Sequence, residues 1–202
     1  LKRMLVNYPD KKFAIVSVDP TKRRSGGALL GDRIRMNSAS NPRIFMRSLA
    51  TRQAHQSLSK YISEVLCAIR HAGFDLIFLE SSGIGQSDTA IVDHSDLSIY
   101  VMTPEYGAPS QLEKSDMIDF ADFVIINKAD KRGAADALRD VRKQYQRTHL
   151  RFDEPVENMP VFLTISSQFN DAGVNRFFEK LTQRISQTIP GKFSPVETGH
   201  AG

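Results

Sequence analysis

The sequence has 202 residues, of which 41% are hydrophobic and 25% are charged, and its formal net charge is +4. This length suits one sizeable α/β core, and no apolar run reaches the roughly 20 residues needed to cross a bilayer. Cys67 is the only cysteine, which excludes a disulfide framework or a thiolate metal cluster within the chain.

The charge and the first residues narrow the class of protein further. A charge of +4 fits an anionic ligand but is too small and too dispersed to indicate nucleic-acid binding. The opening L-K-R-M-L-V lacks the design of a signal peptide, so we expect a cytoplasmic protein that does not bind membranes. The apolar helical pattern around Cys67 predicts a packed core thiol.

The first part of the chain contains a helix end, a strand and a long polar segment. Residues 1–6 are predicted to end a helix, and 13–18 to form a buried strand. Asp19 and Pro20 follow, which places an acid at the carboxyl end of that strand. Residues 21–52 are predicted to form one long basic loop. It is either a solvated loop or a segment that closes over phosphates or meets a partner.

A second buried strand carries the most informative acid. An amphipathic helix over residues 58–69 leads to the apolar run 76–79, and Glu80 follows at once. Open α/β sheets bind ligands at the carboxyl ends of their strands, and glycines such as Gly83 let the backbone approach a ligand closely. We interpret this stretch as the turn that senses magnesium and γ-phosphate in nucleotide triphosphatases. The alternative is an ordinary strand-to-helix turn.

The remaining elements repeat the same alternation. The pattern predicts strands at 97–102, 123–126 and 161–165, and helices at 111–120, 134–145 and 174–189. It favours an α/β fold with a doubly wound, mostly parallel sheet. We therefore expect one domain over residues 1–189, with residues 190–202 as a linker or tail.

The strongest motif is Asn127-Lys128-Ala129-Asp130, directly after the strand 123–126. The carboxylate of Asp130 accepts hydrogen bonds only, so it can pair with guanine N1–H and the exocyclic amine, whereas adenine offers an acceptor at N1. The Lys128 stem would lie across the base, and Asn127 would tie neighbouring loops. The alternative is a lysine-capped surface turn.

Ser166 follows the next strand, in the run Thr164-Ile165-Ser166-Ser167. At this position, guanine-binding folds use a backbone N–H to read the base O6. A serine-rich helix cap explains the same residues without a ligand.

Four segments together resemble the MeaB type of GTPase chaperone, which protects and reloads adenosylcobalamin-dependent acyl-CoA mutases. These segments are V-D-P at 18–20, G-G-A-L-L-G-D-R-I-R-M at 26–36, E-S-S-G-I-G-Q-S at 80–87, and N-K-A-D at 127–130. Within that family, the runs at 45–52 and 167–171 resemble the GTPase domain of fused isobutyryl-CoA mutase. The resemblance extends to about Leu181.

The resemblance implies a role for each candidate residue. Asp19 and Glu80 would act around Mg²⁺, Glu80 and Gly83 would serve hydrolysis, and guanine would be read by Asn127, Lys128, Asp130 and Ser166. Gln111, Glu113 and Lys114 would belong to a switch that signals to the mutase, although this segment is also explained as a loop with an exposed charged helix start. The implied ligands are GTP and Mg²⁺, with adenosylcobalamin only in the partner mutase, fused or separate. A homo-oligomer is also implied.

One element of the family is absent from this sequence. No G-x-x-x-x-G-K-[ST] phosphate loop occurs, and the family places it, with a first strand, just before the position of Leu1. We therefore expect a P-loop NTPase-like domain that lacks its first strand and phosphate loop. The fragment alone should be inactive, with GTPase activity in the intact parent and mutase activity in other domains. Two alternatives remain: a nickel-delivery GTPase of the same fold and a non-hydrolysing interaction domain.

Overall fold

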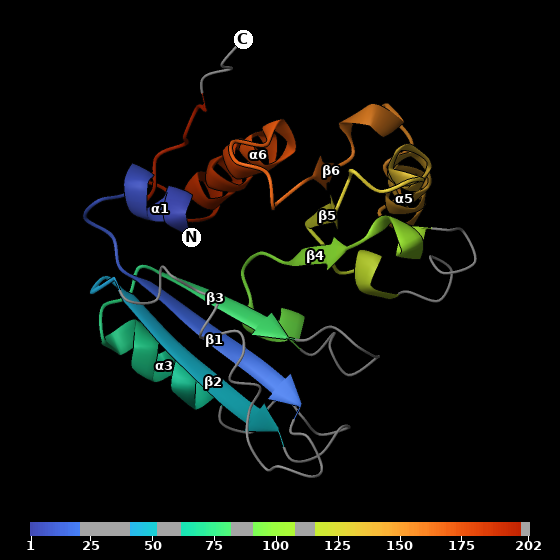
Figure 1. Ribbon diagram of the computed structural model, residues 1–202. Coiled ribbons are helices and arrows are strands. Elements are labelled where there is room, and N and C mark those ends of the chain that lie inside the picture. Colours follow the sequence, from blue (N-terminus) through green and yellow to red (C-terminus); the bar gives the residue numbers. More distant parts are fainter. Residues whose placement is uncertain (21–40, 52–61, 82–90, 108–115, 199–202) are drawn as a thin grey trace. The chain divides into compact units, whose positions relative to one another are not determined.

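In the computed structural model, the described residues are 1–20, 41–51, 62–81, 91–107 and 116–198. They form two compact units, residues 1–95 and 96–202 (Figure 1). Each unit contains a three-stranded parallel sheet with helices packed on it. The predicted α/β class with parallel strands is confirmed, and the described strands pair as two sheets. A first strand and a phosphate loop upstream of Leu1 stay a prediction.

The first unit is organised around β1, the central strand of the order β2-β1-β3. Phe13 of β1 is in register with Ile44 of β2 and with Leu76 of β3. The residues from Phe13 to Val18 are all buried, as expected of a strand with neighbours on both sides and helices on both faces. The elements of this unit are α1 (Lys2–Asn7), β1 (Phe13–Pro20), β2 (Ile44–Thr51), α3 (Ile62–His71) and β3 (Leu76–Ser81).

The side chains of this sheet alternate between two apolar clusters. Ala14 and Val16 pack with the buried side of α3, which presents Ile62, Leu66 and Ile69. The opposite face of the sheet packs with Leu5 of α1 and with Leu1, the N-cap of that helix, in a cluster built from Ile15, Ile44, Met46 and Phe78. Successive side chains of a strand point to opposite faces of the sheet, so a sheet covered on both faces requires apolar residues at successive positions.

Two predictions for this unit are wrong. Residues 44–51 form the edge strand β2, although we expected a loop over 21–52. Ile44 and Met46 are buried and Phe45 and Arg47 are exposed, so the strand has an alternating pattern that the arginines obscure. Cys67 is exposed, because it lies beside the buried stripe of α3 and outside it. Residues 21–40 lie outside the described residues.

The second unit has β5 at the centre of the order β4-β5-β6. On one face, Met102, Val124 and Ile126 pack with Ala137 and Val141 of α5. On the other face, the ring of Phe177 in α6 lies 5.8 Å from that of Phe123 and 5.7 Å from that of Phe162. The elements are β4 (Ile99–Met102), η3 (Pro104–Gly107), η4 (Asp116–Ile118), β5 (Phe123–Asn127), α5 (Ala134–Thr148), η5 (Val156–Asn158), β6 (Val161–Thr164) and α6 (Ala172–Thr188).

The helix predicted at 111–120 is only partly described. Residues 116–118 form a short 3-10 turn, and residues 119–120 continue as a turn, so the expected helix does not reach Phe120. Among the described residues 116–120, Ile118 is fully buried, while Phe120 is 48% exposed. Among the residues that the structure describes, no helix has the length and apolar character needed to span a bilayer.

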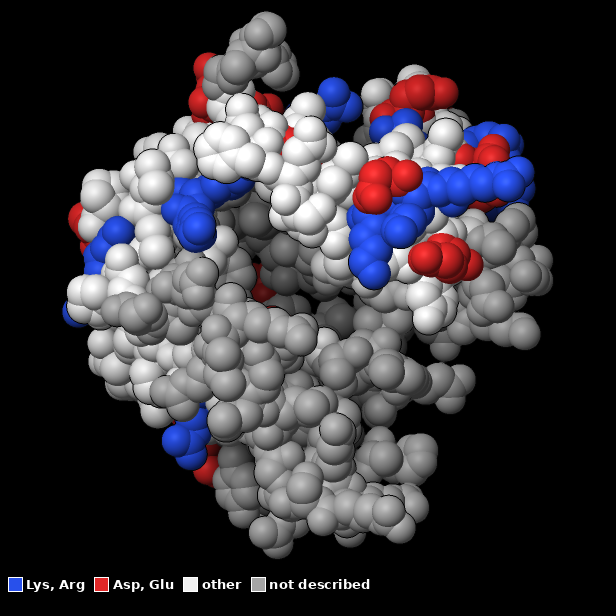
Figure 2. Space-filling view, viewed as in Figure 1, with Lys and Arg blue, Asp and Glu red and all other residues white. Residues whose placement is uncertain are grey.

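Oppositely charged side chains lie next to one another on α5 of the second unit. On α5, the guanidinium of Arg139 lies 3.1 Å from a carboxylate oxygen of Asp136 and 2.9 Å from one of Asp140. Figure 2 shows basic and acidic side chains side by side over this helix. Such exposed pairs contribute little to stability, and they do not form a basic patch.

Candidate functional site

A polar network in the second unit centres on the side chain of Asn127, the last residue of β5. Its Oδ1 accepts three hydrogen bonds: from Ser166 Oγ at 2.9 Å, from Ser166 N at 3.1 Å and from Thr164 Oγ1 at 3.3 Å. Asn127 and Thr164 are register partners in neighbouring parallel strands. The carboxyl ends of β5 and β6 are therefore joined through one amide oxygen.

The turn after Asn127 has an unusual backbone. Lys128 has a φ of 59°, in the left-handed region that non-glycine residues rarely occupy. The N–H of Ala129 donates to the carbonyl of Thr164 at 3.0 Å, and the N–H of Lys131 donates to the carbonyl of Lys128 at 2.9 Å. Strained backbone of this kind persists where surrounding contacts fix it, and it is frequent at functional sites. Lys128 and Asp130 are exposed, as groups that meet a ligand must be.

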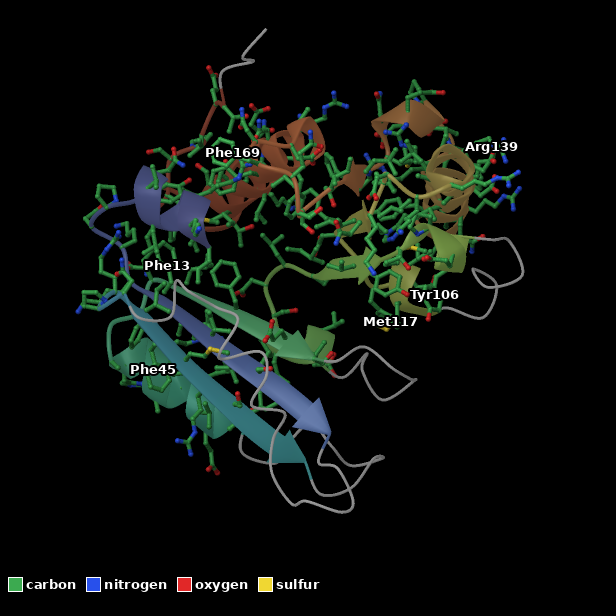
Figure 3. The ribbon with its side chains drawn as sticks, in the orientation of Figure 1. Phe13, Phe45, Tyr106, Met117, Arg139 and Phe169 are labelled. Carbon is green, nitrogen blue, oxygen red and sulfur yellow. The ribbon has the colours of Figure 1, made fainter. Side chains whose placement is uncertain are left out.

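The loop after β6 is held by the start of α6. Asp171, the N-cap of α6, accepts hydrogen bonds on Oδ1 from Val174 N at 2.8 Å and from Ile165 N at 3.2 Å. Ser166, which contacts Asn127, is the residue after Ile165. The loop also contains Phe169, whose side chain is 99% exposed (Figure 3).

A carboxylate from η3 lies within electrostatic reach of the same turn. A hydrogen bond from the Thr103 side chain and one from the backbone N–H of Glu105 lower the pKa of Glu105, and the charges of Lys128 and Lys131 act in the same direction. The end of η3 packs closely on α5, since a Cβ added to Gly107 would lie 2.4 Å from Ala137 Cβ. Residues 104–107, a few positions before the predicted switch residues Gln111, Glu113 and Lys114, are therefore packed on α5.

The two predicted magnesium ligands lie in the first unit, on neighbouring parallel strands. Glu80 of β3 is in register with Ser17 of β1, and the backbone of Asp19 follows two residues after Ser17. Glu80 is half-buried and stands near the carboxyl end of its strand. Carboxylate oxygens are the donors that Mg²⁺ prefers, so the chemistry of this pair fits the ion.

Four predicted residues lie outside the described residues: Gly83, Gln111, Glu113 and Lys114. The structure brings Asn127 and Ser166 into direct contact, with Lys128 and Asp130 in the same turn. It places Asp19 and Glu80 on adjacent strands of the other unit. The roles of all these residues stay predictions.

We predicted no role for three residues that support this network: Thr164 and Asp171, through the hydrogen bonds above, and Gly173, where an added Cβ would lie 1.8 Å from the carbonyl oxygen of Leu163. A signal existed for Asp171, because an aspartate three residues before Val174 at the start of an apolar periodic run predicts an N-cap. No such signal identifies Thr164, whose contact with Asn127 depends on the register of two strands.

The fold and this network define a class of protein. Parallel strands with crossover helices, and an N-K-x-D turn at the carboxyl end of a central strand, are those of a P-loop NTPase-like α/β protein.

The chain belongs to the MeaB family: the family model described as "Methylmalonyl Co-A mutase-associated GTPase MeaB" matches residues 3–191. The resemblance predicted from the motifs is thereby confirmed.

Relatives of the chain include much longer proteins. It is 56% identical over 187 residues to the fused isobutyryl-CoA mutase of Geobacillus kaustophilus, covering 93% of this chain and 17% of that protein. It is 58% identical over 208 aligned positions to the fused isobutyryl-CoA mutase of Cupriavidus metallidurans, covering 98% of this chain and 19% of that protein. A putative GTPase of Pyrococcus abyssi is 33% identical, covering 84% of this chain and 52% of that protein. The chain thus spans less than a fifth of the fused mutases it matches.

A solved structure shows the same fold at low identity. HypB from Helicobacter pylori in complex with nickel superimposes with a TM-score of 0.55 and 17% sequence identity, covering 96% of this chain and 82% of that one. At this identity the likeness concerns the fold alone.

Proposed function

We propose that this chain is the nucleotide-responsive part of a GTPase that couples GTP binding and hydrolysis to cofactor loading or protection of an adenosylcobalamin-dependent acyl-CoA mutase, fused or separate. Membership of the MeaB family supports this proposal, as does the printed name of the fused relatives. The structural observation that carries it is the network on Asn127, which joins the N-K-A-D turn to the loop that bears Ser166.

Guanine selection follows from the chemistry of that turn. Asp130 presents an acceptor-only carboxylate, which matches the two donors of guanine and opposes the N1 acceptor of adenine. The aliphatic stem of Lys128 covers one face of the base, and the tie at Asn127 fixes the turn against the loop that carries Ser166. A site built around such polar pairs rejects the mismatched base strongly, because the carboxylate would be left without a partner.

Phosphate chemistry is assigned to the first unit. Asp19 and Glu80 would hold Mg²⁺, which supplies charge neutralisation at the phosphates when bound. Glu80 and Gly83 would orient the attacking water and sense the γ-phosphate. Gln111, Glu113 and Lys114 would contact the mutase in one nucleotide state and be released in the other. Adenosylcobalamin would be bound by the mutase and not by this chain.

The experiment that tests base selection changes Asp130 in the full-length protein. Calorimetry should show that GDP binds about 100-fold or more tightly than ADP. In Asp130→Asn an amide donor replaces one acceptor oxygen, so the preference should move from GDP to xanthosine diphosphate. Asp153→Asn, which changes an exposed aspartate of the same unit, is the matched control and should leave the preference unchanged.

Two outcomes would contradict the proposed function. Equal affinity of the unaltered protein for GDP and ADP would remove the basis for a GTPase assignment. GDP selectivity without measurable GTP turnover would favour a non-hydrolysing interaction domain.

A further inference from the structure

Asp171 connects two backbone segments through one oxygen atom. Its Oδ1 accepts from Val174 N in the first turn of α6 at 2.8 Å and from Ile165 N, directly after β6, at 3.2 Å. The first contact is an ordinary N-cap, which satisfies an N–H that the helix leaves free. The second contact has no role in capping, because Ile165 lies outside the helix.

Gly173 fixes the start of α6 against the end of β6. A Cβ built on Gly173 would lie 1.8 Å from the carbonyl oxygen of Leu163 and 2.9 Å from its carbonyl carbon. Both are backbone atoms, so they cannot move aside as a flexible side chain could. Any residue larger than glycine would push the helix start away from the strand, and with it the carboxylate of Asp171.

These anchors bracket the loop that contacts Asn127. Ser166 follows Ile165 directly, and it donates to Asn127 Oδ1 from both its N–H and its hydroxyl. Asn127 begins the N-K-A-D turn, and Ala129 N is bound to Thr164 O at 3.0 Å. A continuous chain of contacts therefore runs from Asp171 through Ile165 and Ser166 to the turn that carries Asp130.

We propose that Asp171 is a positioning residue for base selection, which holds the loop after β6 so that Ser166 and Asn127 keep the N-K-A-D turn in its guanine-reading geometry. This inference rests on the proposed function. Gly173 supports the same arrangement by allowing α6 to start on the backbone of β6.

A variant can separate positioning from helix capping. In Asp171→Ser the hydroxyl oxygen is attached directly to Cβ. It therefore lies one bond closer to the backbone than Oδ1 of aspartate, which is attached to Cγ. It can still cap Val174 N, because serine is as good an N-cap as aspartate, but it does not extend to Ile165 N. Asp171→Asn keeps an oxygen at the Oδ1 position and both acceptor contacts. Asp153→Ala, at an exposed aspartate of the same unit, is the control for loss of one negative charge.

The measurement is the ratio of the ADP and GDP dissociation constants of the full-length protein, with thermal melting recorded for each variant. We expect Asp171→Asn and Asp153→Ala to keep the wild-type ratio within about twofold. Asp171→Ser should stay folded and melt within a few degrees of Asp171→Asn, while the ratio falls about tenfold through weaker GDP binding, the loss expected when one hydrogen bond no longer orders the site.

Three results would contradict the positioning role of Asp171. A wild type that selects GDP, together with an Asp171→Ser variant that selects it equally well, would overturn the positioning role and leave the proposed function intact. An equal loss of GDP and ADP affinity would also overturn it, since that pattern reflects general loosening. A wild-type ratio near one would instead remove the proposed function, and the role of Asp171 with it.

Discussion

At the residue scale, Arg43 shows how one side chain organises the first unit. Its Nη1 donates to the carbonyl oxygens of Tyr8 at 2.8 Å and Lys11 at 3.2 Å, and its Nη2 donates to that of Leu5 at 2.9 Å. The carbonyls of Leu5 and Tyr8 belong to the last turn and the C-cap of α1, where carbonyls receive no hydrogen bond from within the helix, and that of Tyr8 also accepts from Lys11 N at 3.3 Å. Arg43 belongs to the basic segment 21–52, for which we left open a solvated loop or a segment that meets phosphates or a partner, and here it makes a structural contact.

Loss of this contact should destabilise the first unit. Arg43→Ala leaves three carbonyls without their cationic donor, and we expect a loss of about 2 kcal/mol or more in the free energy of unfolding. Arg43→Lys keeps the charge but not the planar fork, so it should recover at most half of the loss. Denaturation in urea measures both, and Arg47→Ala on the exposed side of β2 is the control. A fully stable Arg43→Lys variant would show that charge alone suffices.

The residues identified from the sequence and those missed differ in how far apart they stand in the chain. Asn127, Lys128 and Asp130 are contiguous and follow an apolar strand, so a linear pattern reveals them. The partners of Asn127 stand 37 and 39 positions away, and the register of β5 with β6 brings them together. The left-handed conformation of Lys128 likewise has no signature in its residue type.

At the scale of elements, helix α6 holds the segment that follows it. The N–H of Val196 donates to Thr182 Oγ1 at 3.1 Å, and the N–H of Thr198 donates to Glu179 Oε1 at 2.8 Å. Thr182 is fully buried, and Phe193 is only 2% exposed. The described residues 190–198, part of the stretch 190–202 that we predicted to be a linker or tail, therefore lie against α6 without forming a helix or strand of their own.

Thr182 should control how firmly this segment is held. Thr182→Val keeps the shape but removes the acceptor for Val196 N, so the amide of Val196 should exchange with solvent about tenfold faster, the equivalent of one lost hydrogen bond. Amide exchange followed by NMR measures this. Thr188→Val is the matched control, because the hydroxyl of Thr188 bonds to Arg184 O within the same helix. Unchanged exchange at Val196 in Thr182→Val would mean that other contacts hold the segment.

Elements were predictable from the sequence where burial was complete on both faces. The central strand β5 begins with an uninterrupted apolar run and that of β1 is broken only by the buried Ser17, and the positions of both strands were predicted to within two residues. The edge strand β2 was missed because Arg47 and Ser48 interrupt its apolar pattern, although Ile44 and Met46 pack on one face of the sheet and Leu49 packs on the other. The pairing of the strands into two sheets was also not predictable, since an apolar pattern identifies a strand but not its neighbour.

At the scale of the whole molecule, the candidate residues are divided between the two units. Asp19 and Glu80 belong to residues 1–95, whereas Asn127, Asp130 and Ser166 belong to residues 96–202. The proposed roles of the two units differ accordingly: the first would bind magnesium and the phosphates, and the second would recognise the base. Such a division can be tested with partial ligands that offer one part of the nucleotide at a time.

Guanosine, which has the base but no phosphates, should therefore act on the second unit alone. Hydrogen exchange measured on the full-length protein should show protection by guanosine at residues 123–133 and 161–173, because a bound ligand suppresses local opening where it makes contacts. A non-hydrolysable GTP analogue with Mg²⁺ should add protection at the carboxyl ends of β1 and β3, and removal of Mg²⁺ by a chelator should reverse only that addition. Adenosine is the control and should protect neither set. If guanosine protected β1 and β3 as strongly as β5 and β6, the base would be read by residues of both units, and the division of roles proposed here would be wrong.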